Sequence, residues 1–165
     1  MRLLKFGIIC FVVFFAVITA ISLLFPTHIR VSKAISLSRH ADSVFYLIND
    51  FKQWPRWHPA FEGQKNIDSV LQKNSIRLTR IVRTDSLITM NWQQANKTPI
   101  VNSWQIHQFG TEDSVALQWY MDFDLKWYPW QKFGSLLYEN SYGRLMELGL
   151  QNIKQIVQQK DSSHS

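Results

Sequence analysis

One segment between residues 113 and 130 constrains the fold more than any other, because its side chains alternate strictly in character. Polar side chains such as Gln118 and Asp122 fall between apolar ones. The alternating apolar residues are Val115, Leu117, Trp119, Met121, Phe123 and Leu125. A period of two indicates a β-strand with one buried face. Pro129 ends the pairing, because proline has no backbone N–H to donate. The segment predicts the last strand of an antiparallel sheet, followed from about Gln131 by a helix that packs back over the sheet.

Four further segments have strand composition. A first strand is predicted at residues 29–38, where the alternation slips near Ala34, and three more at 76–82, 87–92 and 100–109. The short connections between the later strands favour antiparallel hairpins over crossover units.

The C-terminal segment has the spacing of an amphipathic helix. Its apolar positions recur at intervals of three and four residues and predict one face directed at the sheet. These positions are Tyr138, Tyr142, Leu145, Met146, Gly149, Ile153, Ile156 and Val157. Strands followed by a long helix predict an α+β domain.

The N-terminus carries a different signal. Phe6 to Phe25 is a run of twenty residues without a charge, and a helix of that length spans about 30 Å, the thickness of a bilayer's hydrocarbon core. Pro26 follows it. We expect an uncleaved transmembrane helix; a signal peptide cleaved after Ala20 is the alternative. The single cysteine, Cys10, lies inside this run and can form no intramolecular disulfide.

Charge gives a weak indication of topology and of partners. Basic residues flank the run on both sides in similar numbers, so the positive-inside rule hardly favours one orientation over the other. A short basic N-terminus usually stays in the cytoplasm, which favours a bacterial inner-membrane protein with its domain on the periplasmic side. The net charge is +6, but the basic residues of the domain are scattered rather than clustered, and we expect no nucleic-acid partner.

Two motifs resemble those of a known family. The segment VFYLINDFKQWPRWHP contains Val44 and Phe45 followed by a Trp-x-x-Trp pair, Trp54 and Trp57, and the C-terminal part has a Trp-x-Pro-Trp corner and a Gly-rich final helix. The latter residues are Trp127, Pro129, Trp130, Gly143 and Gly149. These motifs resemble the START-like (SRPBCC) superfamily, in particular its polyketide cyclase/dehydrase and lipid-transport branch.

The resemblance implies a helix-grip fold, in which a curved antiparallel sheet wraps around a long C-terminal helix. Together with the apolar run at the N-terminus, the predicted organisation is a short basic N-terminus (1–5), a transmembrane helix (6–25), a START-like domain (29–158) and a disordered tail (159–165).

A curved sheet that grips a helix can enclose a cavity, and the side chains predicted to face it are large and apolar, as in many small-molecule sites. The predicted lining residues are Trp54, Trp57, Arg80, Ile88, Met90, Trp92, Trp104, Ile106, Leu117, Trp119, Met121 and Phe123. Arg80 could pair with an acidic head group or point to solvent. The two tryptophans of the first motif could gate the cavity or cap the core, and the same bulky side chains could fill the interior completely.

Catalytic chemistry has little support in the sequence. No nucleophile–base pair, facing carboxylates or metal-ligand spacing is present, so we expect no metal and no cofactor. His58 and His107 are the only candidate acid–base residues. The sequence therefore predicts membrane-anchored, non-catalytic binding of a hydrophobic small molecule or lipid. The alternatives are a cyclase/dehydrase-type enzyme and a protein-interaction module that uses the aromatic clusters at 54–61 and 127–130.

Overall fold

The computed structural model describes residues 2–37, 41–63, 76–94, 97–108 and 114–162. The helices and strands in chain order are α1 (Arg2–Ser22), β1 (His28–Leu37), α2 (Ala41–Asn49), η1 (Phe51–Gln53), α3 (Trp54–Trp57), η2 (Pro59–Phe61), β2 (Ile76–Arg83), β3 (Leu87–Gln94), β4 (Ile100–Gln108), β5 (Val115–Asp124), α4 (Pro129–Ser135), η3 (Glu139–Gly143) and α5 (Arg144–Ser162).

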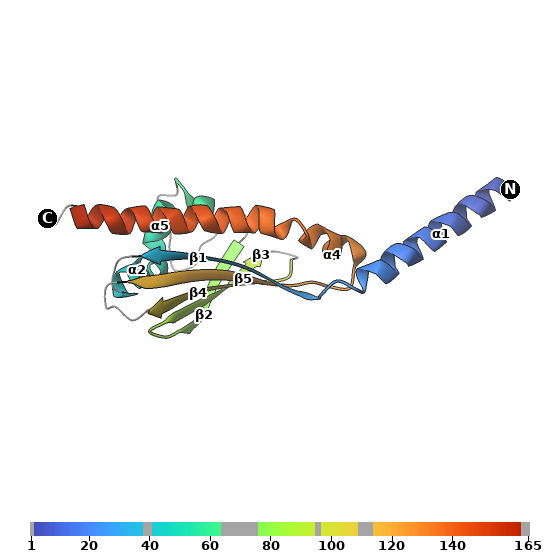
Figure 1. The fold of residues 1–165 in the computed structure, drawn as a ribbon. Coiled ribbons are helices and arrows are strands. Elements are labelled where there is room, and N and C mark those ends of the chain that lie inside the picture. The colour runs from blue at the N-terminus through green and yellow to red at the C-terminus, as the bar shows by residue number, and fades with distance from the viewer. Residues whose placement is uncertain (1, 38–40, 64–75, 95–96, 109–113, 163–165) are drawn as a thin grey trace.

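The described strands form one antiparallel sheet in the order β1-β5-β4-β3-β2. The long α5 helix runs across one face of this sheet, with α2 at the far end of the sheet from α1, and α1 projects from the opposite end of the domain (Figure 1). This is the predicted α+β helix-grip architecture. The alternation of β5 is confirmed, because Val115, Leu117, Trp119, Met121 and Phe123 are all buried.

The predicted slip near Ala34 is wrong. β1 pairs with β5 without interruption from His28 to Leu37, and its burial alternates strictly. Lys33 occupies an inward-facing position, where its Nζ lies 2.8 Å from carboxylate oxygens of both Glu139 and Glu147. A lysine paired with two glutamates thus replaces an apolar side chain, and this replacement made the pattern look broken.

The predicted single C-terminal helix is also corrected, because it is interrupted. α4 ends at Ser135, a turn at Leu136 and Leu137 follows, and one turn of π-helix at Glu139–Gly143 leads into α5. Such π-helical turns are rare and often lie near functional sites. α5 continues through Ser162, so the described part of the predicted tail is helical.

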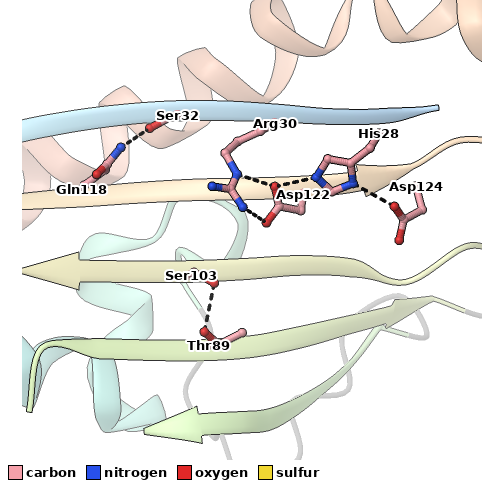
Figure 2. A network of polar contacts seen from close by, with 8 residues as sticks. All are labelled: His28, Arg30, Ser32, Thr89, Ser103, Gln118, Asp122 and Asp124. Atoms are coloured by element: carbon pink, nitrogen blue, oxygen red, sulfur yellow. Dashed lines mark hydrogen bonds and ion pairs between the residues drawn. The ribbon is translucent and has the colours of Figure 1, made fainter. Parts of the chain in front are cut away.

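The outer face of the sheet, away from α5, is polar (Figure 2). Arg30 donates two hydrogen bonds to the Asp122 carboxylate, at 2.6 and 2.9 Å. His28 lies beside Asp122 and Asp124, and its hydrogen bond with Asp124 is the main cause that raises the pKa of the imidazole. This face is thus a solvated surface, and the apolar interior lies between the sheet and α5.

The N-terminal helix stands apart from the domain. α1 has a mean hydropathy of 2.6 over its most apolar stretch, none of which is buried. It is therefore long and apolar enough to cross a membrane, a test that a signal sequence near the N-terminus would also pass.

Candidate functional site

Eleven of the twelve predicted lining residues lie in the interior. Trp54, Trp57, Trp104 and Trp119 have no exposed surface, and Trp92, at 8 %, is the most exposed of the eleven. The remaining residue, Arg80, pairs with Met90 in the sheet next to a register shift; its side chain lies outside the part of the chain that the structure describes. These eleven side chains, from β3, β4, β5 and α3, are therefore part of the buried interior.

The first aromatic motif is packed into the core. Trp54 Nε1 donates to the Ile48 carbonyl at 2.8 Å, and Trp57 Nε1 donates to the Leu47 carbonyl at 2.9 Å. Both bonds tie α3 to the end of α2. With Phe61 also buried, this cluster cannot serve as an exposed docking patch.

Part of the interior is closed by direct contact between α5 and the sheet. A Cβ atom built on Gly149 would lie 2.8 Å from the Trp119 ring and 3.5 Å from Pro59 Cδ. Real Cβ atoms do not approach other atoms so closely, so glycine is the residue that allows this contact. No ligand can lie between helix and sheet at this point.

His58 is a titratable side chain buried in the interior, 1 % exposed. Its ring stacks on Trp54 at 5.2 Å with an interplanar angle of 2°, and also contacts Phe61, Trp92 and Trp119. Burial among these rings disfavours the charged imidazolium and lowers the pKa of His58 to about 3. Nδ1 accepts a hydrogen bond from the Ala60 backbone N–H at 3.2 Å, so the proton of the neutral ring resides on Nε2. That nitrogen has no partner among the described residues.

Three more buried donors lack a partner within the described part of the chain. Asn102 Oδ1 accepts from Trp119 Nε1 at 3.3 Å, which leaves the Asn102 amide nitrogen unpaired, and the indole nitrogens of Trp92 and Trp104 are unpaired as well. Our sequence reasoning missed Asn102. The period-two register of β4 could have found it, since position 102 shares a face with Trp104. The inner face of the sheet thus carries hydrogen-bond donors that have no acceptor among the described residues.

A half-open pocket of about 290 Å³ lies beside the last residues of β5 and the first residue of β4. Part of its lining is aromatic and consists of Phe123, Tyr138 and Tyr142. The ring centroids of Tyr138 and Tyr142 each lie 4.7 Å from that of Phe123. The remaining lining residues are Lys97, Thr98, Pro99, Ile100, Asp124, Leu125, Lys126 and Gln131. Phe123 is the predicted site residue that lines the pocket, and Tyr138 and Tyr142 come from the interruption between α4 and α5.

Two other hollows are outlined by described residues. One lies between α2 and the β2–β3 turn, beside Tyr46 and Arg83. The other is a shallow surface around the ion pairs of Lys33 with Glu139 and Glu147. Neither touches a predicted lining residue.

Comparison with solved structures shows the same fold in proteins of low sequence identity. A START superfamily protein from Mycobacterium smegmatis matches with a TM-score of 0.60 and 18 % identity, over 79 % of this chain and 97 % of that chain. A protein of unknown function from Staphylococcus aureus matches with a TM-score of 0.61 and 11 % identity, over 82 % of this chain and 96 % of the other.

A third similar structure is the di-domain ARO/CYC StfQ from the steffimycin biosynthetic pathway, with a TM-score of 0.62 and 10 % identity. The match covers 82 % of this chain and 52 % of StfQ. At these identities the likeness shows the fold alone. No curated protein matches the chain by sequence.

The family comparison is more specific, because it depends on sequence. The family described as polyketide cyclase / dehydrase and lipid transport matches residues 28–158. This range runs from the first residue of β1 to near the end of α5 and includes the pocket, His58 and the aromatic interior. The chain therefore belongs to the polyketide cyclase / dehydrase and lipid transport family.

Proposed function

We propose that this chain is a single-pass membrane protein whose START-like domain (residues 29–158) binds a hydrophobic small molecule or lipid without transforming it. Residues 6–25 form the anchor, after a basic N-terminus at residues 1–5. The domain lies on the periplasmic side of a bacterial inner membrane. The description of the family, which includes lipid transport, supports the ligand class.

The observation that carries the proposal is the pocket beside Phe123. Three aromatic rings form one part of its lining, and polar residues, including the exposed Lys97 and Lys126, form much of the rest. Aromatic and apolar side chains combined with polar groups that orient a ligand are typical of small-molecule sites. Its volume of about 290 Å³ lies at the lower end of the range for such sites, roughly 300–1,000 Å³. It suits one acyl chain or one small ring system with an anionic group near the lysines.

The predicted inner-face residues form a deeper part of the proposed site. Ligand that passes Phe123 would meet the unpaired donors of Asn102, Trp92 and Trp104. Each buried donor left without an acceptor costs about 1–3 kcal/mol, so an oxygen-bearing ligand or buried water gains by supplying acceptors. Entry to this depth requires the packed rings to move.

A binding assay tests the pocket. The full chain in nonionic detergent is titrated with a dansyl-labelled fatty acid, and lipid that co-purifies is identified by native mass spectrometry. Thr98→Trp fills the mouth and should weaken binding about tenfold or more, which corresponds to about 1.4 kcal/mol. Thr79→Trp, a matched change at an exposed position of β2, should bind as the wild type does. Equal binding by both variants would place the ligand elsewhere, and absence of binding in the wild type would refute the proposal.

A photoactivatable fatty acid separates the two depths. Cross-links at Tyr138 or Tyr142 indicate binding in the pocket, and cross-links at Trp104 or Met121 indicate entry to the inner face. If the probe marks only α1, the ligand is held by the anchor and not by the domain.

The second candidate is a cyclase/dehydrase-type enzyme, and His58 is the observation that favours it. Its unpaired Nε2–H could donate to a carbonyl oxygen. It is poorly suited to remove a proton, because Nδ1 is occupied by the Ala60 N–H and the low pKa makes it a weak base. A synthetic linear polyketone incubated with the wild type and with His58→Phe tests this role: a cyclised product that forms only with the wild type would establish catalysis.

A further inference from the structure

α4 has its polar and apolar faces reversed relative to a helix of a soluble domain. Pro129, Lys132 and Ser135, at intervals of three, are buried. Trp130 and Phe133, also three apart, are 62 % and 37 % exposed. A helix normally buries its apolar stripe and exposes its charges, so the medium outside α4 should be apolar.

The exposed apolar surface extends beyond the helix. Leu136 and Leu137 follow α4 directly and are 59 % and 62 % exposed, and Trp127 precedes it at 59 %. Tyr128 stacks on Trp130, with ring centroids 4.8 Å apart. Trp and Tyr are the residues enriched at membrane–water interfaces, where an amphipathic ring has one end in each medium.

α4 is fixed directly to the end of α1 (Figure 1). Lys132 Nζ donates to the Phe25 carbonyl at 2.6 Å, in the segment just after the helix, and Ser135 Oγ donates to the Lys132 carbonyl at 2.6 Å. A lysine here satisfies a free carbonyl and complements the negative end of the helix dipole. The rings of Phe25 and Phe133 pack edge to face at 5.4 Å. The buried polar face of α4 is therefore the joint between the domain and α1.

This joint determines what surrounds the exposed face. Leu23 and Leu24 belong to the apolar run that continues from α1, and they are 66 % and 85 % exposed. If α1 spans a bilayer, these residues lie near its surface, and the face of α4 held beside them must lie at the same depth. A lipid interface therefore fits this surface better than a protein partner does.

We propose that the juxtamembrane surface, defined as Trp127, Trp130, Phe133, Leu136 and Leu137, lies in the head-group region of the bilayer that α1 spans, so that the domain is docked on the phospholipid surface. The inference rests on the anchoring in the proposed function, but not on any ligand. Gln131 and Tyr138 flank this surface and also line the pocket. Docking thus places the pocket mouth at the membrane, where an apolar ligand could exchange without crossing water.

Site-specific fluorescence measures the depth of this surface. The full chain is reconstituted in phosphatidylcholine/phosphatidylglycerol vesicles and labelled with NBD at single cysteines. Natural Cys10, exposed on α1, reports the span. In a Cys10→Ser background, Leu136→Cys and, separately, Trp130→Cys report the juxtamembrane surface. Gln155→Cys, exposed near the far end of α5, is the matched control. These sites are exposed, so the changes should not disturb packing; near-ultraviolet circular dichroism of the buried tryptophans checks the fold.

We expect nitroxide lipids labelled at the head group to quench positions 136 and 130 about twofold more than position 155. If position 10 is quenched by lipid but 136 and 130 respond like 155, the docking is refuted while the anchor stands. If position 10 is not quenched by nitroxide lipids labelled on the acyl chain, the anchor itself fails and the docking fails with it. If 136 and 130 are shielded from both lipid and aqueous iodide, a second copy or another protein covers the surface, which also overturns the proposal.

Discussion

His58 should make the domain lose stability in mild acid by an amount that can be calculated. The ring is buried among Trp54, Phe61, Trp92 and Trp119, and its pKa in the folded state is about 3, against an ordinary value of 6.5. Between these two values the unfolded chain binds a proton that the folded chain excludes. The contribution of His58 to stability is therefore fully present above pH 6.5 and is lost as the pH falls toward 3.

The size of the loss follows from the gap between the two pKa values. Each pH unit in this interval changes the free energy of unfolding by about 1.4 kcal/mol per excluded proton. From pH 7 to pH 5 the unfolded histidine goes from mostly neutral to almost fully protonated, while the folded one stays neutral. The expected loss is about 2 kcal/mol, a large part of a typical domain's stability of roughly 5–15 kcal/mol.

The assay compares the wild type with His58→Phe, which preserves an aromatic ring in the same surroundings and cannot titrate. Urea unfolding of the full chain in nonionic detergent, followed by tryptophan fluorescence, gives the free energy of unfolding at pH 7 and pH 5. Other titrating groups contribute equally to both proteins and cancel in the difference. The wild type should lose about 2 kcal/mol more than the variant. Equal losses would mean that His58 is solvated or charged in the folded state, and the packed aromatic interior around it would be wrong.

Two further predictions concern packing and charge. Gly149→Ala should destabilise the domain by about 1–3 kcal/mol through overlap with the Trp119 ring, less about 1 kcal/mol regained in helix propensity. The control Gly134→Ala, whose Cβ meets nothing within 4 Å, should be neutral or stabilising in the same urea titration. Equal effects of the two changes would contradict the close contact between Gly149 and Trp119. Asp122→Asn should weaken the pairing with the half-exposed Arg30 and lower the free energy of unfolding by no more than about 1 kcal/mol. This loss should be smaller in high salt. A loss that does not depend on salt would count against an ion pair.

The strands and their faces were predictable because a strand with one buried face has an apolar side chain at every second position. Val115 to Phe123 could be assigned to one buried face from spacing alone, and the sheet and helix followed in the right order. Lys33 shows the limit of this reasoning. Its two glutamate partners lie more than a hundred residues away in sequence, and without them an inward lysine looks like a break in the pattern.

The candidate site was predictable only in part. The spacing of Trp104 and Trp119 identified them as inward residues, but it could not show that Trp119 presses on Gly149 and closes the interior there. The described pocket lies instead at the end of the sheet, shaped by the interruption between α4 and α5. This break was hidden because Tyr138 and Tyr142 keep helical spacing through the π-helical turn.

Local sequence alone determined the apolar N-terminal helix, the alternating strands and the family to which the domain belongs, because each of these depends on the order of neighbouring side chains. Only the tertiary structure decided that His58 is sealed among aromatic rings, that Lys132 is turned inward to the end of α1, and that Trp130 faces outward. These outcomes depend on which distant segments meet, since a side chain's burial and charge are set by the partners that the fold brings to it.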